Sequence, residues 1–305
     1  MVEITFLGTA SAFPTASRNH PSVYVSLGGA KVLLDCGEGT QRQIRRAGLS
    51  PAIDYIFITH WHGDHSLGVG GILQSLNMIN RREPLFVYGP AGTNSRMAHL
   101  SKTYQFHSAV KVVSKPVDAP KESVIASIND YDVYALNVKH AVKCLAYKIK
   151  ERDTLNLRED LLKKYGIKPD PILKRLKEGK DAVYNGRKLP HRQFTYVKKG
   201  RSVVYVTDLA YSDSVGRFAR DADALVIEAT FSSSMGEKAG SYFHLTVEQA
   251  LKIAKRAGAK KVYLVHTSQR YENDDALVKE AAAMKEKLEL GADVFFPNDL
   301  DKIEI

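Results

Sequence analysis

Short apolar runs separated by glycine and polar residues fill the first part of the chain. Each run is too short for a helix and is rich in β-branched residues, so the pattern predicts strands. The N-terminal strands are expected at residues 3–7, 23–27, 31–35 and 55–59. Similar runs predict later strands at 85–88, 132–138, 145–149, 203–206, 224–227, 262–265 and 294–296.

Apolar residues at helical spacing predict helices at 67–80, 246–257 and 274–288, between the groups of strands. Thr246 suits the N-cap of the second helix, and Glu248 suits its first turn. Strands grouped with helices between them indicate an α/β layered domain. We therefore expect a single domain over residues 1–305.

Residues 151–199 interrupt this pattern. They contain two short helix candidates at 158–165 and 172–177, with Gly166, Pro169 and Pro171 between them, and few residues that could join the main core. This composition favours an inserted arm over a second full domain.

Charge separates the same region from the rest of the chain. The net charge is +10, and residues 143–201 hold 18 Lys or Arg against 7 Asp or Glu, which is +11 and leaves the remainder at −1. A general lysine bias, as in a heat-adapted protein, would explain the total but not its concentration in one stretch. The distribution favours an anion-binding surface, most simply for nucleic acid.

The sequence also indicates a compartment. No apolar stretch approaches the roughly 20 residues that span a bilayer, and the first residues do not form a signal peptide. Cys36 and Cys144 lack CxxC spacing, so buried packing is expected for both. We expect a cytoplasmic protein with no membrane partner.

The densest set of candidate ligands is the run His60-Trp61-His62-Gly63-Asp64-His65, between an apolar strand and a helix. Zinc binds imidazole nitrogen and carboxylate oxygen, and a strand-to-helix turn lets such side chains converge. Four ligands in one loop exceed what one zinc with an open position needs. The run therefore predicts two metals in one cleft.

Further ligands are expected where other strands end. His140, Asp208 and His266 each follow an apolar strand, at the edge where ligands gather in open α/β sheets. Each alone is more often a turn residue or a hydrogen-bonded core group, and the whole set could be coincidence with surface histidines. With the first run, however, the set contains enough ligands for a bridged pair. The remaining histidines are assigned other roles: surface or capping for His99 and His107, solvated for His191, open for His20.

Two metals about 3.5–4 Å apart hold a hydroxide nucleophile and clamp a phosphoryl or acyl oxygen. Asp64 is the candidate that steers or deprotonates the attacking water. Glu228 and His244 could form the pair that protonates the leaving oxygen. A cap carboxylate and a buried histidine remain an equal alternative for these two.

The HxHxDH run with later His, Asp and His resembles the metallo-β-lactamase superfamily, and further segments resemble its ribonuclease Z family along essentially the whole chain. These segments are Phe6-Leu7-Gly8-Thr9, Pro14 with Arg18-Asn19, Leu33-Leu34-Asp35-Cys36-Gly37-Glu38-Gly39-Thr40-Gln41, Glu228-Ala229-Thr230-Phe231, His244-x-Thr246 and His266-Thr267-Ser268-Gln269-Arg270-Tyr271.

The resemblance implies a four-layer αβ/βα sandwich with an inserted exosite arm. It implies two Zn²⁺ per subunit: one held by His60, His62 and His140, the other by Asp64, His65 and His266, with Asp208 bridging. Glu228 and His244 become the proton-donating pair, and the arm at 151–199 binds tRNA, with Arg18 and Asn19 as further substrate contacts.

The implied activity is an endonuclease that acts on precursor tRNA as a homodimer. It cuts after the discriminator nucleotide with a metal-activated hydroxide, leaving a 3′-hydroxyl on the tRNA and a 5′-phosphate on the trailer. Ala16 stands where the family usually has lysine, in a loop that bears on CCA ends. Two alternatives remain open: a small-molecule phosphodiesterase or esterase of the same fold, and a non-catalytic RNA-binding module.

Overall fold

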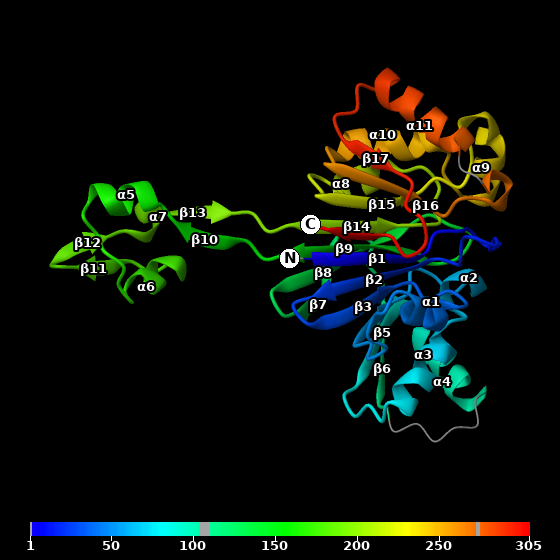
Figure 1. Ribbon diagram of the computed structural model, residues 1–305, viewed down its shortest axis with the longest axis horizontal. Coiled ribbons are helices and arrows are strands. Elements are labelled where there is room, and N and C mark those ends of the chain that lie inside the picture. Colours follow the sequence, from blue (N-terminus) through cyan, green and yellow to red (C-terminus); the bar gives the residue numbers. More distant parts are fainter. Residues whose placement is uncertain (1, 104–109, 273–274) are drawn as a thin grey trace. The chain divides into compact units, whose positions relative to one another are not determined.

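Two seven-stranded sheets form the frame of the protein in a computed structural model that describes residues 2–103, 110–272 and 275–305 (Figure 1). In the first sheet, β18, β1, β2 and β3 pair antiparallel, and β3 to β6 pair parallel. In spatial order its strands are β18 (Lys302–Glu304), β1 (Val2–Gly8), β2 (Ser22–Leu27), β3 (Ala30–Leu34), β4 (Tyr55–Phe57), β5 (Leu85–Pro90) and β6 (Val112–Val117).

The second sheet carries the later strands of the chain. Its strands β17, β16, β15 and β14 pair parallel, and β8 and β7 pair antiparallel. In spatial order they are β17 (Asp293–Phe295), β16 (Lys261–Val265), β15 (Ala224–Glu228), β14 (Ser202–Val206), β9 (Cys144–Glu151), β8 (Tyr131–Val138) and β7 (Ser123–Ile128).

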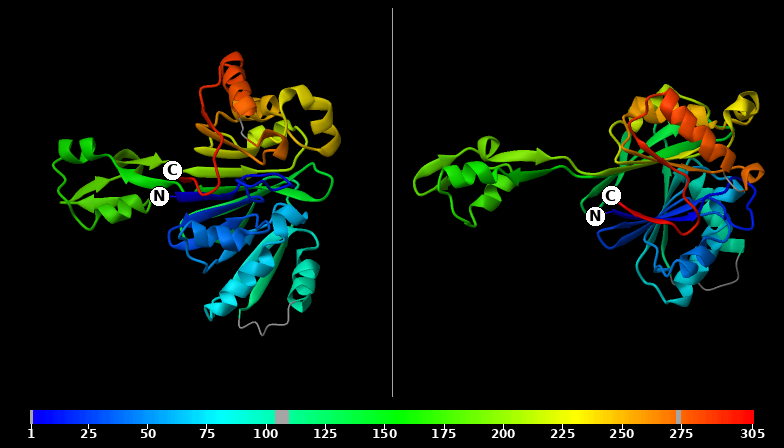
Figure 2. Two further views of the ribbon diagram at one scale, coloured as in Figure 1. Left: turned by 45° about the vertical axis from the view of Figure 1, so that its right-hand side comes forward. Right: turned by 45° about the horizontal axis from the view of Figure 1, so that its top comes forward.

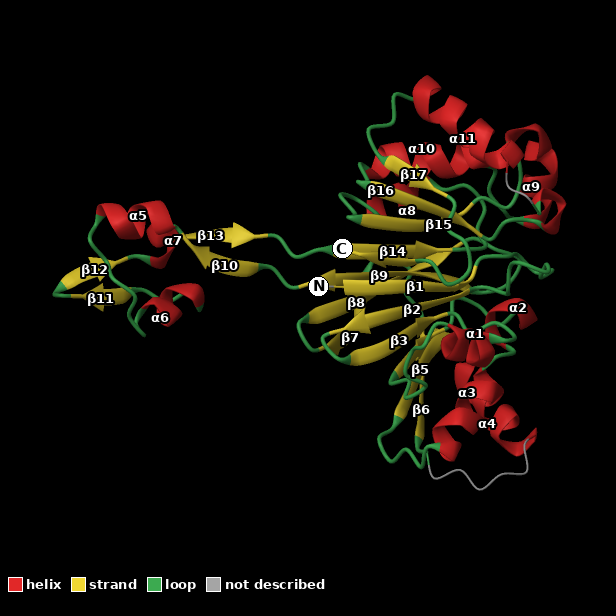
Figure 3. Ribbon diagram, viewed as in Figure 1, coloured by secondary structure: helices red, strands yellow, loops and turns green. Residues whose placement is uncertain are grey.

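Helices cover the outer face of each sheet, which makes four layers (Figures 2 and 3). Beside the first sheet lie α1 (Thr40–Arg46), α2 (Gly63–Ser66), α3 (Val69–Met78) and α4 (Thr93–Thr103). Beside the second lie α8 (Asp213–Phe218), α9 (Gly236–Tyr242), α10 (Val247–Ala257) and α11 (Asp275–Lys287), with 3-10 turns at Ser233–Met235 and Gln269–Tyr271. This is the expected αβ/βα sandwich.

Strand β14 shows why the central strands are continuously apolar in sequence. Val203 and Tyr205 belong to the core between the two sheets, whereas Val204 and Val206 belong to the core beneath α8 and α10. All five residues of the strand are buried because both of its faces are covered. A third core lies between the first sheet and helices α1, α3 and α4.

The sequence pattern found the covered strands and missed the marginal ones. β6 and β7 lie at sheet edges and are mostly half-exposed, and β18 has three residues, so none has a clear apolar run. The predicted helices match α3, α10 and α11, although Asp274, the expected start of the last one, lies outside the described residues. Thr246 caps α10 as expected, in a capping box with Gln249.

Residues Lys150–Arg201 form a second compact unit. Its elements are β10 (Thr154–Leu157), α5 (Glu159–Lys164), α6 (Leu173–Lys177), β11 (Ala182–Tyr184), β12 (Arg187–Leu189), α7 (His191–Phe194) and β13 (Thr195–Lys198). The unit has a small core of its own, in which Leu176, Leu189 and Phe194 are almost fully buried. It holds 16 Lys or Arg against 7 Asp or Glu. The two helices predicted for the arm are present as α5 and α6.

Both cysteines are buried and unpaired, as the packing prediction required. Burial raises the pKa of each thiol, so both stay protonated at neutral pH. Among the described helices, none combines the length and apolar character that a membrane crossing needs.

Candidate metal centre

The HxHxDH run lies between β4 and α2, where it was expected. β4 ends at Phe57, His60 and His62 occupy the following loop, and Asp64 and His65 lie in the first turn of α2. The helical region thus begins within the run, at Gly63, rather than after it at residue 67. This turn orients the last two ligands differently from the first two, so all four can face one cleft.

The three later ligand candidates follow strands β8, β14 and β16 and meet the first run. The structure groups His60 with His62 and His140, and Asp64 with His65 and His266. Asp208 forms a further group with His60 and His65, so its carboxylate lies between the two sets. The seven predicted ligands therefore lie together in one cluster, and a fourth group joins Asp208 and His266 with His244.

The distances between ligand atoms are short. The Oδ2 of Asp208 lies 2.8 Å from the Nε2 of His65 and 3.2 Å from the Nε2 of His266. The Nε2 of His60 lies 2.9 Å from the Nδ1 of His62. The Nε2 atoms of His65, His140 and His266 and the Oδ2 of Asp208 are buried, yet they have no hydrogen-bond partner among the described residues. Buried polar atoms without such partners, converging on one point, fit a site for metal ions.

The protonation states of His60, His140 and the two carboxyls suit metal ligands, whereas the pKa of His65 is raised because Asp35 and Asp208 outweigh burial. Burial, together with the neighbouring histidine His65, lowers the pKa of His60 to about 2, and burial lowers the pKa of His140. Burial disfavours ionised Asp64 and Asp208, but His65 and His266 outweigh it and lower the pKa of both carboxyls. Neutral imidazoles and ionised carboxylates are the forms that bind a divalent cation.

Two ligands and one supporting residue have a strained backbone. Asp208 has φ of 54°, His266 has φ of 62° and Asp35 has φ of 56°, all in the left-handed region that residues with a side chain rarely adopt. Each directly follows, or lies within two residues of, the end of a strand. The packing of the sandwich holds these conformations in place. They direct the side chains towards the cleft.

Asp35 also belongs to the site, although the sequence pattern did not predict it as a site residue. Its carboxylate accepts hydrogen bonds from the backbone N–H of Thr59 at 2.7 Å and from the Tyr205 hydroxyl at 3.0 Å, and it lies 2.7 Å from the Nδ1 of His65. Asp35 follows β3 just as His266 follows β16, so its position at a strand end was the available signal.

Glu228 and His244 form a pair beside the ligand cluster. The Nδ1 of His244 lies 3.0 Å from the Oε2 of Glu228 and 3.3 Å from the Oδ1 of Asp208. Glu228 is fully buried and also accepts the backbone N–H of Leu209 at 2.8 Å. Burial opposes a charge on His244, but Glu228 and Asp208 outweigh it and raise its pKa to about 9. Glu228 thus contacts both a backbone N–H, as a cap carboxylate would, and the His244 ring, and the role of the two as a proton-donating pair stays a prediction.

Arg18 and Asn19 organise a loop near the N-terminus. The Arg18 side chain is buried and its Nη1 donates to the Pro297 carbonyl at 2.9 Å, while the Asn19 side chain donates to the Glu38 carbonyl at 2.8 Å. Both side chains therefore have internal partners, and their contact with substrate stays a prediction. Of the other histidines, His99 is exposed on α4, as expected, and His191 is partly exposed with its Nδ1 3.0 Å from Asp181. His107 lies outside the described residues.

The chain is similar to known proteins along its whole length. Residues 2–152 match the family model for the anti-Pycsar protein Apyc1, and residues 188–267 match that of the beta-lactamase superfamily domain. Ribonuclease Z of Pyrococcus horikoshii is 34% identical over 310 residues, covering 100% of this chain and 96% of the relative. Ribonuclease Z of Methanococcus maripaludis is 38% identical over 288 residues, covering 93% and 94%.

The chain belongs to the ribonuclease Z family. As a member of that family it is a nuclease with a metallo-β-lactamase fold, and this fold implies metal ions. The crystal structure of the short form of human tRNase Z shares this fold, with a TM-score of 0.71, 23% identity and coverage of 99% of each chain.

Proposed function

We propose that this ribonuclease Z family member is a zinc-dependent endoribonuclease that removes the 3′ trailer of precursor tRNA. The cut falls after the discriminator nucleotide, leaving a 3′-hydroxyl on the tRNA and a 5′-phosphate on the trailer. The observation that carries the proposal is the convergence of two three-residue ligand groups, joined by Asp208, beside the Glu228–His244 pair. A site for two ions beside a proton donor suits the hydrolysis of a phosphodiester, because it can activate water and stabilise both the attacking and the leaving oxygen.

The ligand chemistry supports zinc, with two ions per subunit. His60, His62 and His140 would hold one ion, Asp64, His65 and His266 the other, and Asp208 would bridge. Imidazole nitrogen and carboxylate oxygen are ligands that zinc accepts. When bound, such a pair of ions supplies Lewis-acid activation of water and neutralises charge on the phosphoryl oxygens.

The residues of the chain supply proton transfer and orientation. Burial disfavours ionised Asp64, but the neighbouring His266 and His65 rings outweigh it and lower its pKa, so Asp64 is ionised and can orient the attacking water by accepting a hydrogen bond from it. As the new oxygen–phosphorus bond forms, the bond from phosphorus to the 3′-oxygen of the tRNA breaks. His244 donates a proton to that oxygen, and Glu228 holds the ring through its Nδ1–H.

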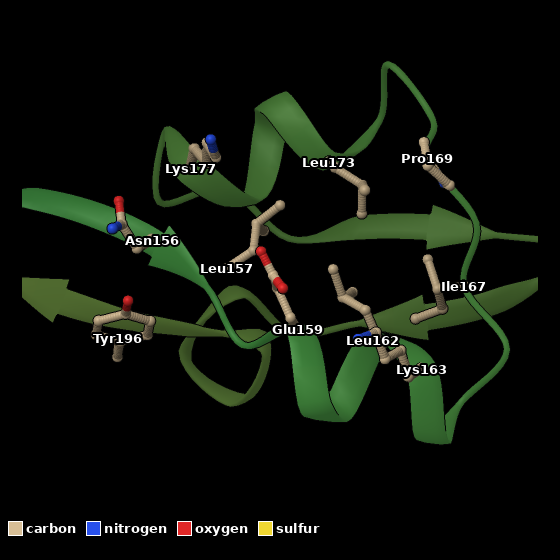
Figure 4. A pocket seen from close by; sticks show the side chains of 10 residues that line it. All are labelled: Asn156, Leu157, Glu159, Leu162, Lys163, Ile167, Pro169, Leu173, Lys177 and Tyr196. Atoms are coloured by element: carbon tan, nitrogen blue, oxygen red, sulfur yellow. The ribbon is translucent and has the colours of Figure 1, made fainter.

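The positive charge of the unit Lys150–Arg201 supports the proposal that the substrate is a polyanion. We infer that it binds precursor tRNA through phosphate contacts and that the enzyme acts as a homodimer. The unit has a hollow of about 430 Å³ in which Leu157, Leu162 and Ile167 face a common space, with Lys163 and Lys177 among the residues that line it (Figure 4). Buried, unpaired thiols at Cys36 and Cys144 are consistent with a cytoplasmic enzyme.

A direct assay tests the proposal. Purified protein is incubated with 3′-extended precursor tRNA, with and without an encoded CCA, and both ends of each product are mapped. The expected products are a tRNA ending in a discriminator 3′-hydroxyl and a 5′-phosphorylated trailer, with about two zinc ions per chain by metal analysis. A chain that binds no metal, or that leaves the precursor intact, would overturn it. Ala16 makes the comparison of the two substrates informative, because it lies in the loop that bears on CCA ends.

A further inference from the structure

A polar hollow of about 510 Å³ lies in the main unit, between the loop from Pro14 to His20 and helix α1. Arg42 and Arg46 of α1 form part of its wall, and Asp299 lies among the residues that line it. No Phe, Tyr or Trp belongs to its lining among the described residues. The hollow therefore suits a charged group better than a stacked base.

Asp299 fixes the base of this hollow by holding three segments together. Its Oδ1 accepts the N–H and the hydroxyl of Thr9, at 3.1 and 2.8 Å. Its Oδ2 accepts the backbone N–H of Asn19 at 2.7 Å and the Nε2 of Gln43 at 2.8 Å. Both carboxylate oxygens thus already accept two hydrogen bonds each, which offset part of the repulsion between Asp299 and an anion in the hollow.

The positive charge of the hollow comes from one face of α1. Arg42 and Arg46 are four residues apart, so they lie on the same side of the helix, and both are exposed. The Nη1 of Arg46 donates to the Oε1 of Gln43 at 2.8 Å, which leaves most of its N–H donors available. The facing acid, Glu38, has a side chain that is 71% exposed, so water screens its charge.

The wall of the hollow is continuous with the metal loop. His20 lines the hollow, and Gly37 packs between His20 and the carbonyl oxygen of Asp64 so closely that a Cβ on Gly37 would collide with both. The segment before the loop from Pro14 to His20 also contacts the metal ligands' neighbours: the N–H of Ser11 donates to the carbonyl of Thr267, which follows His266, at 3.1 Å. A strand of RNA held at the metal centre therefore has this hollow within reach of its adjoining backbone.

We propose that the hollow binds a backbone phosphate of the RNA strand next to the phosphate that is cleaved, through the guanidinium groups of Arg42 and Arg46. Planar guanidinium groups match the geometry of phosphate oxygens and remain charged at all relevant pH values. The inference rests on the proposed function, and it adds a second, non-reacting phosphate contact that positions the strand for cleavage.

The first test compares arginines of the same helix. Arg42→Ala, Arg46→Ala and the double variant remove the proposed contacts, and Arg45→Ala is the matched control, because Arg45 is an exposed arginine of α1 that does not line the hollow. For cleavage of precursor tRNA, KM is expected to rise about tenfold in the double variant with kcat little changed, since a charged hydrogen bond to phosphate is lost. The magnitude of the slope of log affinity against log salt should fall by about 0.7 in the double variant, because one phosphate contact of a single strand is lost.

The second test locates the phosphate. Precursors carrying one uncharged 2′-deoxy methylphosphonate linkage, at successive positions beside the cleavage site, are compared with 2′-deoxy phosphate controls. At one position other than the cleaved bond, the methylphosphonate is expected to raise KM above that of the phosphate control for the wild-type enzyme and for Arg45→Ala. In the double variant, the methylphosphonate and the phosphate control at that position should have the same KM. Zinc content and circular dichroism equal to those of Arg45→Ala show that the variants are folded.

Equal effects of Arg45→Ala and the double variant would overturn the inference, because they would indicate only general charge attraction. It is also overturned if the double variant retains the wild-type KM and salt slope. Both results leave the proposed function standing as long as the wild-type enzyme cleaves the precursor. An inactive wild-type enzyme, by contrast, would contradict the proposed function itself and the inference with it.

Discussion

The Asp35 carboxylate lies 2.7 Å from the Nδ1 of His65, and both side chains are completely buried. Asp35 also accepts hydrogen bonds from Thr59 and Tyr205, which join it to the metal loop and to the second sheet. Burial disfavours the charged ring, but Asp35 and Asp208 outweigh it and raise the pKa of His65. Asp35 therefore fixes the ring so that Nε2 faces the other ligands.

Asp35→Asn is expected to weaken metal binding, because an amide replaces the charge that orients His65. Substitutions at such supporting positions lower metal affinity or activity about 10–100-fold. Zinc per chain after dialysis against a graded chelator measures the effect. Asp223→Asn is the control, since Asp223 pairs with Lys260 at the surface. Equal zinc retention by both variants would contradict the role of Asp35.

His244→Ala is expected to slow the chemical step about 10²–10⁴-fold with two zinc ions retained, since a general acid contributes a factor of that size. Single-turnover cleavage and a tRNA binding assay separate rate from affinity. Lost tRNA affinity with an unchanged single-turnover rate would assign His244 to binding instead.

Asp64→Ala is expected to nearly abolish cleavage while tRNA binding is retained, because Asp64 contacts both His65 and His266 in the second ligand group. Zinc content should fall below two per chain in this variant. Cleavage at the wild-type rate would remove Asp64 from the mechanism.

Replacing residues 154–198 by a two-residue Asn-Gly turn tests the basic unit. Thr154 pairs with Lys198 in an antiparallel ladder, so a tight turn can join the two ends. Cleavage of precursor tRNA should collapse, while hydrolysis of a small phosphodiester such as bis(p-nitrophenyl) phosphate should persist. Unchanged tRNA cleavage would show that the unit is dispensable and would contradict its proposed role in tRNA binding.

Asp299 predicts a pH dependence of stability. Burial outweighs its hydrogen bonds and raises its pKa from 3.8 to about 6, so between about pH 4 and 6 the folded chain holds this proton more tightly than the unfolded chain. Protonated Asp299 therefore adds up to about 3 kcal/mol to the free energy of unfolding. This stabilisation is fully present below pH 4 and is lost as the pH rises to 6 and above. Urea unfolding of the metal-free wild type and Asp299→Asn at pH 4.5 and 6.5 measures it. The stability difference between the two proteins should change with pH, and a constant difference would contradict the prediction.

Gly37→Ala is expected to destabilise the chain and reduce cleavage, because the added Cβ collides with His20 and the Asp64 carbonyl. Overpacking of this kind costs about 1–3 kcal/mol. Gly291→Ala is the matched control, since a Cβ there meets nothing within 4 Å. Thermal unfolding and zinc content should distinguish the two variants.

Much of this protein followed from sequence pattern alone. The central strands were predictable because both faces of strands such as β14 are covered, which makes them continuously apolar. The ligands at His60–His65 were predictable because they are adjacent in the chain, and His140, Asp208 and His266 because each follows such a strand. Glu228 and His244 were candidates for a proton-donating pair from the residues themselves, and the family resemblance favoured that role.

What only the tertiary structure decided is which of these side chains meet, and through which partners. Asp35 and His65 are 30 positions apart, and Asp299 contacts Thr9 across 290 positions, so no local pattern encodes either contact. The left-handed backbone at Asp35, Asp208 and His266 likewise depends on packing, because the intrinsic preference of these residues opposes it. The sequence by itself therefore determined the ligand types and the strand ends that carry them, and the packing of two sheets determined how those ends form one site.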